Sequence, residues 1–130
     1  VVEPLPGGHD LAEARGGIKR ADFRQHVDQI LLVDPANALE RLASRCDVIH
    51  VDFDIDVVER HAMPGAPGAR PGGVAVQDFF DATRLICAHP KVRSVDLTEF
   101  DPSLDVADIT SLTAARWVCE VLAGLHLRRG

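Results

Sequence analysis

The chain has 130 residues, of which 46% are hydrophobic and 26% are charged, and its formal net charge is −6 at pH 7. This composition is typical of a globular domain and excludes a disordered chain, while the negative charge argues against a nucleic-acid partner. No run approaches the roughly 18 consecutive apolar residues of a membrane span, so we expect no membrane partner. The three cysteines are widely spaced without a CxxC pair, which predicts buried free thiols in a reducing cytoplasm.

The first part of the chain predicts only short elements. Residues 1–20 contain four of the ten glycines and are poorly defined. A short helix is expected over residues 21–28 and a short buried strand over residues 30–33. Asp34 followed by Pro35 is a good helix start, and that helix is expected to run to about residue 45 with Leu39, Leu42 and Ala43 inward.

The second part of the chain alternates between strands and helices. We predict an acidic strand over residues 49–57, a Pro/Gly loop over 63–73, a helix over 76–89, a strand over 92–97 and a closing helix over 107–125. The inward stripe of the closing helix is predicted to be Ala115, Val118, Cys119 and Leu122. Strand, helix, strand and helix in succession imply right-handed crossovers and a parallel sheet with flanking helices, which is an α/β fold.

The acidic strand carries the chemistry. Side chains alternate along a strand, so one face is expected to hold His50, Asp52, Asp54 and Asp56. Asp54 and Asp56 would then lie roughly 7 Å apart, and carboxylates this close repel one another unless cations are bound. A solvated strand face is the alternative. The Pro/Gly loop favours a site, because ligands of open α/β sheets collect beyond the carboxyl ends of strands.

Two blocks of the chain occur in a fixed order. The first reads Asp52-Phe53-Asp54-Ile55-Asp56-Val57, then Pro64-Gly65 and Pro71-Gly72-Gly73, and the second runs from Val95 through Glu99 and Asp101-Pro102 to Asp105. Together they resemble the ureohydrolases, the family of arginases, agmatinases and formimidoylglutamases. The resemblance covers residues 47–125 and implies the back half of an arginase-like three-layer α/β/α fold. We therefore predict that residues 1–130 are a single partial domain of this kind.

The resemblance implies a manganese-dependent hydrolase that cleaves C–N bonds of a small-molecule amidine, either a guanidino or a formimino compound. Asp54 and Asp56 correspond to ligands of a binuclear Mn²⁺ site, and Glu99 corresponds to the acid that anchors the substrate. In the family, the metal pair lowers the pKa of a bridging water, and hydroxide attacks the C=N carbon.

Several other polar residues have two interpretations. Arg70 could pair with a substrate carboxylate, which would favour formimidoylglutamate over agmatine. His61 could approach the substrate or be a solvated loop histidine, and His50 is expected to be structural. Asp101 and Asp105 are expected to cap the turn or helix that follows each of them.

The chain also departs from the family. The upstream Gly-Gly-Asp-His and Asp-Ala-His-x-Asp blocks, which supply the remaining metal ligands, have no counterpart; the run Gly7-Gly8-His9-Asp10 has its His and Asp swapped and is predicted to be a loop. The start at Val1, with Met63 as the only Met, suggests truncation. We therefore expect a C-terminal portion with half a metal site, inactive on its own. The alternative is a catalytically inactive remnant that acts as a binding or oligomerisation module, and a homo-oligomer is compatible with either.

Overall fold

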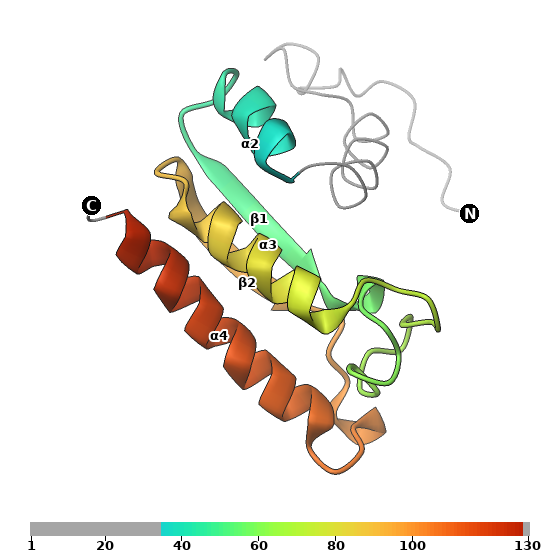
Figure 1. The fold of residues 1–130 in the computed structure, drawn as a ribbon. Helices are drawn as coiled ribbons and strands as arrows, with labels where there is room; N and C mark the ends of the chain where they lie inside the picture. The colour runs from blue at the N-terminus through green and yellow to red at the C-terminus, as the bar shows by residue number, and fades with distance from the viewer. Residues whose placement is uncertain (1–34, 129–130) are drawn as a thin grey trace, which may run out of the picture. The chain divides into compact units, whose positions relative to one another are not determined.

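The computed structural model describes residues 35–128, which fall within one compact unit, Pro35–Gly130. Three helices and two strands make up this part: α2 (Pro35–Ala43), β1 (Ile49–Asp54), α3 (Val76–Ala88), β2 (Val92–Thr98) and α4 (Ile109–Leu127). Single turns of 3₁₀-helix, η2 (Ile55–Val57) and η3 (Pro102–Leu104), follow the two strands (Figure 1). The predicted helix over 21–28, strand over 30–33, Asp34 cap and loop at residues 7–10 lie outside the described residues.

The two strands pair in parallel, as the sequence predicts, with Val51 opposite Val95 and Asp54 opposite Thr98. One face of the pair turns Phe53 and its apolar neighbours into the core. The other face carries exposed polar side chains, including His50 and Asp52. Helix α3 connects β1 to β2, and α3 and α4 lie side by side over the sheet (Figure 1).

Aromatic side chains hold α3 and α4 against the sheet. Phe53 of β1 meets Phe79 of α3 with ring centroids 5.9 Å apart and Trp117 of α4 with centroids 5.4 Å apart, both edge-on. Edge-to-face contacts are the favourable geometry for aromatic pairs. The indole N–H of Trp117 is buried and has no hydrogen-bond partner among the described residues.

Helices α3 and α4 approach closely where Gly124 faces α3. A Cβ at Gly124 would lie 2.6 Å from the Arg84 carbonyl oxygen and 2.6 Å from the Cβ of Cys87. Beside it, the carboxylate of Glu120 is buried and accepts hydrogen bonds from Arg116 Nε and Arg84 Nε, each at 2.7 Å. These hydrogen bonds hold the pKa of Glu120 below its usual range. The buried charge is therefore paired, as burial of a carboxylate requires.

The three helices expected within the described residues form close to their predicted bounds, and the core positions of α3, which include Phe79, Phe80, Ile86 and Cys87, are buried as predicted. In α2, Leu39 and Ala43 are buried and Leu42 packs against the core. No helix in this part of the chain combines the length and apolar character that would let it cross a membrane.

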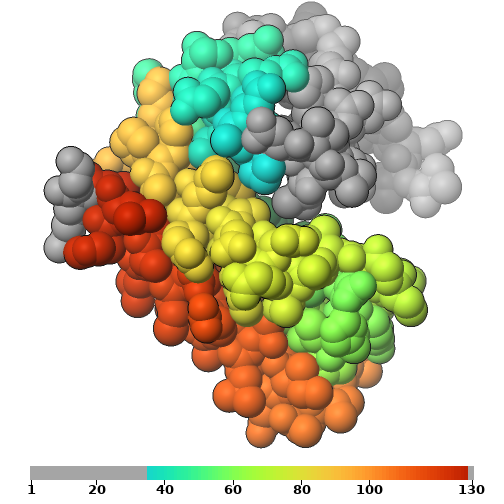
Figure 2. All heavy atoms as spheres, in the orientation of Figure 1, coloured from blue at the N-terminus to red at the C-terminus, as the bar shows by residue number. Residues whose placement is uncertain are grey.

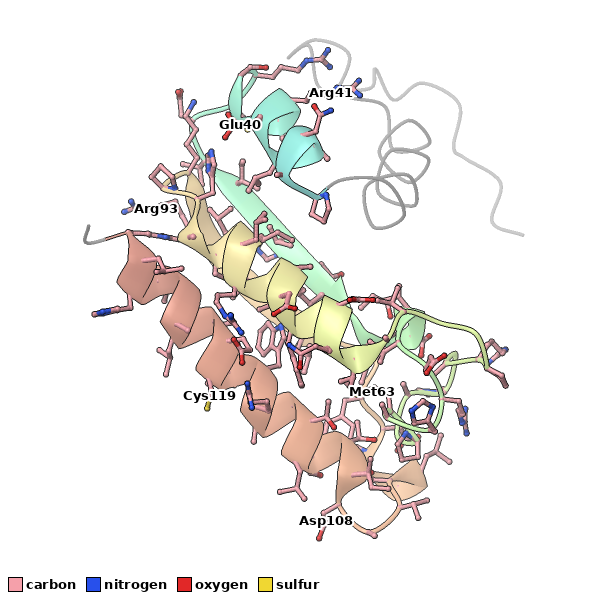
Figure 3. All side chains as sticks on the ribbon, in the orientation of Figure 1. Glu40, Arg41, Met63, Arg93, Asp108 and Cys119 are labelled. Atoms are coloured by element: carbon pink, nitrogen blue, oxygen red, sulfur yellow. The ribbon has the colours of Figure 1, made fainter. Side chains whose placement is uncertain are left out.

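The predicted inward stripe of the closing helix is wrong. Val118, Leu122 and Cys119 are exposed, and α4 instead buries Thr110, Trp117, Glu120 and Gly124. Figure 3 shows Cys119 on the side of α4 that faces away from α3. Helix α4 is apolar around most of its circumference, so its hydrophobic periodicity allows either of two faces to be buried. The aromatic contact with Phe53 determines which face is buried.

The prediction of buried cysteines is correct for one of the three. Cys87 is buried, Cys46 is half-buried and Cys119 is exposed, and all three are free thiols. Burial raises the pKa of the Cys87 thiol.

Candidate active site at the carboxyl edge of the sheet

The acidic strand is shorter than predicted, because β1 ends at Asp54 rather than at residue 57. The Oδ1 atom of Asp54 accepts a hydrogen bond from the backbone N–H of Asp56 at 2.9 Å and so caps the 3₁₀ turn η2. Asp56 therefore lies on a turn, and the predicted strand alternation does not extend to it. The two carboxylates are instead related by a hydrogen-bonded turn, the local geometry that aspartate side chains favour.

The Asp56 carboxylate is fixed by the Pro/Gly loop. The backbone N–H of Gly68 donates to Asp56 Oδ1 at 2.7 Å. A Cβ at Gly68 would lie 1.9 Å from Asp56 Oδ2, far inside van der Waals contact. Only glycine allows the loop backbone to come this close, so the position of Asp56 depends on Gly68.

Each carboxylate of the pair thus uses one oxygen for a backbone N–H. The second oxygen of Asp54 and of Asp56 makes no hydrogen bond to the described residues. Both acids are consequently oriented by the backbone while keeping an oxygen for a ligand.

Two arginines donate hydrogen bonds to carbonyl oxygens of the Pro/Gly loop. Arg60 Nη1 donates to the carbonyl oxygen of Ala66 at 3.2 Å, and Arg70 Nη1 donates to those of Pro67 and Ala69 at 3.2 and 3.0 Å. Sequence reasoning considered Arg70 only as a substrate contact and missed the loop role of Arg60. The two arginines stabilise the turn that presents Gly68.

The loop is also tied to the end of β2 and the start of α4. The backbone N–H of Gly65 donates to Thr110 Oγ1 at 2.7 Å, and the N–H of Asp101 donates to the Gly65 carbonyl at 2.8 Å. Thr110 is fully buried. These bonds hold the segments after both strands together at one edge of the sheet, a feature that sequence spacing alone did not reveal.

Glu99 occupies the same edge. It directly follows β2, one residue beyond Thr98, which pairs with Asp54. Its side chain is exposed and its φ is +67°. A residue other than glycine in this left-handed region is uncommon, and such backbone strain clusters at functional sites.

Asp101 and Asp105 are caps, as predicted. Asp101 Oδ1 accepts hydrogen bonds from Ser103 N at 2.9 Å and Ser103 Oγ at 2.7 Å. Asp105 accepts from the backbone N–H groups of Thr110 at 2.9 Å and Ser111 at 3.0 Å, at the start of α4. Loss of solvent around Asp105 acts to raise its pKa, but these hydrogen bonds outweigh it and hold the pKa of that carboxyl well below its usual range.

The two histidines near the strand contact acids. His61 is exposed, with Nδ1 3.3 Å from Glu59 Oε2. His50 lies on the polar face of β1, with Nε2 3.5 Å from Asp96 Oδ1. Among the described residues, neither histidine makes a hydrogen bond to Asp54 or Asp56.

The donor chemistry of the edge fits a divalent metal only in part. Carboxylate oxygens suit Mn²⁺ or Mg²⁺, and Asp54 and Asp56 each present one. Within residues 35–128, however, no group of three or more His, Cys, Asp or Glu side chains could hold a metal ion. The described residues therefore contribute part of a coordination shell and do not complete one.

The chain is an α/β protein with a parallel pair of strands, and Asp54, Asp56 and Glu99 lie at or just beyond the carboxyl ends of those strands. The sequence pattern of the arginase family matches residues 5–124. The chain belongs to the arginase family.

Two relatives and one solved structure illustrate the match. The chain is 34% identical over 83 residues to the formimidoylglutamase of Bacillus subtilis (strain 168) and 32% identical over 108 residues to that of Halalkalibacterium halodurans. The crystal structure of the Bacillus subtilis formimidoylglutamase superposes on 90% of this chain with a TM-score of 0.68 and 27% identity.

The matches cover only part of each relative. The chain spans 26% and 34% of the two formimidoylglutamases and 37% of the crystallised chain. It therefore resembles about a third of the length of the proteins to which it is similar.

Proposed function

We propose that this chain supplies the carboxylate-bearing edge of a manganese-dependent hydrolase that cleaves the C–N bond of a formimino or guanidino compound. The observation that carries the proposal is the oriented pair of Asp54 and Asp56. Both carboxylates are held by backbone N–H groups at 2.7–2.9 Å, and each keeps one oxygen for a ligand. We also propose that residues 1–130 form one partial domain, since the family match spans 5–124.

We assign roles in this proposed reaction to three side chains. Asp54 and Asp56 would hold metal, together with ligands from outside the described residues, and a bound manganese pair would activate water for hydrolysis. Glu99 would anchor the amidine group, because its carboxylate is exposed at the same edge and opposite in charge to an amidinium. The left-handed backbone at Glu99 is strained, and such strain is typical of functional sites, where the position of a side chain must be fixed.

Formimidoylglutamate is the favoured substrate. The formimidoylglutamases of Bacillus subtilis and Halalkalibacterium halodurans are among the relatives, with 34% and 32% identity. Such a substrate carries carboxylates, and two cationic or titratable groups, Arg70 and His61, lie in the segment after β1. Arg70 uses Nη1 for the loop carbonyls, which would fix its guanidinium for a substrate carboxylate. A cytoplasmic location would suit the three free thiols.

The direct test is calorimetric titration of Mn²⁺ into the purified chain and into an Asp54→Ala/Asp56→Ala double variant. We expect the wild-type chain to bind the ion through the preoriented pair and the double variant to lose that binding.

A matched control is Asp96→Ala, which removes an exposed strand carboxylate that lies on the polar face and contacts His50. This variant should bind manganese as the wild type does. Equal weak binding by all three proteins would contradict the proposal and would leave a binding or oligomerisation module as the better interpretation.

A further inference from the structure

The peptide group between Pro67 and Gly68 is held at both of its polar ends. Its N–H belongs to Gly68 and donates to Asp56 Oδ1 at 2.7 Å. Its carbonyl oxygen belongs to Pro67 and accepts from Arg60 Nη1 at 3.4 Å and from Arg70 Nη1 at 3.2 Å. Because a peptide group is planar, the direction of its carbonyl sets the direction of its N–H. One peptide group thus connects two guanidinium groups to a candidate metal ligand.

This peptide is the central one of a β-turn over residues 66–69. The backbone N–H of Ala69 closes the turn by donating to the Ala66 carbonyl at 3.2 Å. Proline followed by glycine at the two central positions is typical of a type II turn, in which the glycine has a positive φ. Gly68 does not have a positive φ, so the turn is not of type II. The local sequence thus favours a turn that the structure does not adopt.

A type II turn would reverse the peptide, because the two common turn types differ by a rotation of the central peptide of roughly 180°. The N–H of Gly68 would then point away from Asp56. Gly68 has no Cβ that opposes this rotation, and Pro67 is exposed. Figure 2 shows the loop, in green to yellow-green, at the surface of the molecule. Hydrogen bonds from side chains, rather than packing, therefore select the orientation of the peptide.

Arg60 is the better placed of the two arginines to select it. Its Nη1 also donates to the Ala66 carbonyl at 3.2 Å, and its backbone N–H donates to the Arg70 carbonyl at 3.3 Å. Arg60 is partly buried, whereas Arg70 is exposed. A guanidinium keeps its charge, and charged donors make stronger hydrogen bonds than neutral ones. A reversed peptide would take the Pro67 carbonyl away from this charged donor.

We propose that Arg60 is a positioning residue that holds the Pro67–Gly68 peptide in the orientation that fixes Asp56. The guanidinium stabilises the carbonyl end of the peptide, and the carboxylate accepts from the N–H end. The peptide is therefore bound between a cation and an anion, which permits a single orientation. The effect of Arg60 on metal affinity rests on the proposed function, whereas its effect on the turn does not.

The experiment compares the full 130-residue chain with Arg60→Met and Arg60→Lys by nuclear magnetic resonance in a metal-free chelating buffer. The nuclear Overhauser effect between Pro67 Hα and the Gly68 amide proton is strong in a type II turn and weak in the turn described above. Arg60→Met should raise the population of the type II turn at least about tenfold, because a hydrogen bond from a charged group is lost. Arg60→Lys keeps a charged donor and should restore the original turn in part.

Arg93→Met is the matched control. Arg93 is exposed near the amino end of β2, and Figure 3 shows it at the opposite end of the sheet from Met63 in the Pro/Gly loop. This variant should keep the turn of the wild type. Calorimetric titration of Mn²⁺ then measures the consequence for the site. Arg60→Met should bind the ion at least about tenfold more weakly, as when a group that orients a metal ligand is lost, and Arg93→Met should bind it like the wild type.

The outcomes separate this proposal from the proposed function. A turn that changes in Arg60→Met, while none of the chains binds Mn²⁺, would support the positioning role and contradict only the proposed function. An unchanged Overhauser effect in a folded Arg60→Met chain would overturn the positioning role, whatever the manganese affinity. If circular dichroism shows that Arg60→Met does not fold, Arg60→Lys decides. A partial gain of the type II turn in that variant would support the proposal, and a turn identical to that of the wild type would overturn it.

Discussion

At the scale of single residues, one glycine determines how the candidate site is presented. Gly68 donates its N–H to Asp56 at 2.7 Å from a position where any Cβ would collide with that carboxylate. Asp54 in turn accepts the N–H of Asp56. The pair is therefore oriented by main-chain groups. Because these groups are already ordered, they lose little conformational entropy when a ligand binds.

A Gly68→Ala substitution should move the Asp56 carboxylate and break its hydrogen bond. We expect manganese affinity to fall about tenfold or more, the range seen when groups that orient a metal ligand are removed. Calorimetric titration measures the change. The control is Gly72→Ala, since Gly72 has φ +79° but open space around its Cβ position; this variant should lose about 1 kcal/mol of stability and keep its metal affinity.

Asp105 should make stability depend on acid pH. Its folded-state pKa lies below its ordinary value because of hydrogen bonds from Thr110 and Ser111, which outweigh the opposing loss of solvent. A depressed pKa contributes stability that is present above the unfolded-state pKa of about 3.9 and is lost as the pH falls through the folded-state value. Urea unfolding should show Asp105→Asn less stable than wild type at pH 7, with the difference shrinking below about pH 4. A difference that is constant with pH would contradict this account.

At the scale of elements, the packing of α4 on β1 depends on Trp117. Its ring contacts Phe53, but its buried N–H has no partner among the described residues, which costs free energy that a hydrocarbon ring would not. The same helix buries Glu120 against two arginines. Helix α4 thus buries both an unpaired donor and a paired charge in one interface.

Trp117→Ala should lower the free energy of unfolding by about 3–5 kcal/mol, as expected when a buried aromatic side chain is truncated. Trp117→Phe should cost much less, because it keeps an aromatic contact and removes the unpaired N–H. Chemical denaturation of both variants gives the comparison. Equal losses would indicate that the indole N–H has a partner that the described residues do not show.

At the scale of the whole molecule, the site is incomplete within the described residues. Asp54, Asp56 and Glu99 share one edge of the sheet, yet no cluster of three metal-binding side chains forms there. The chain spans about a third of the proteins it resembles. The metal-assisted hydrolysis that we propose would require several ligands per ion, and the described edge alone does not supply them.

We therefore predict that the isolated chain has no measurable turnover with Mn²⁺ and formimidoylglutamate, agmatine or arginine. Formamide and urea release are the measurements. Manganese-dependent release that is absent from Asp54→Ala/Asp56→Ala would show that the chain completes its own site and would contradict this prediction.

Much of this organisation could be predicted from residues in chain order. The parallel strand–helix–strand unit follows from hydrophobic periodicity, and the capping roles of Asp101 and Asp105 follow from the preference of aspartate for helix starts. The end of β1 at Asp54 could not be predicted from the sequence. Two acids that are two residues apart fit both an alternating strand and a turn in which the first acid caps the second. The role of Gly68 could not be predicted either, since it depends on a contact with Asp56 twelve residues earlier.

The sequence by itself determined the α/β class, the family and the acids that stand at the strand ends, because these follow from local pattern and motif order. Only the tertiary structure decided that Asp56 sits on a turn clamped by Gly68 and that α4 buries Trp117 while Val118 and Leu122 face outward. Helix α4 is apolar on both sides, so its own sequence allows either stripe to be buried. Contacts with residues far away in the chain, above all Phe53, select one of them.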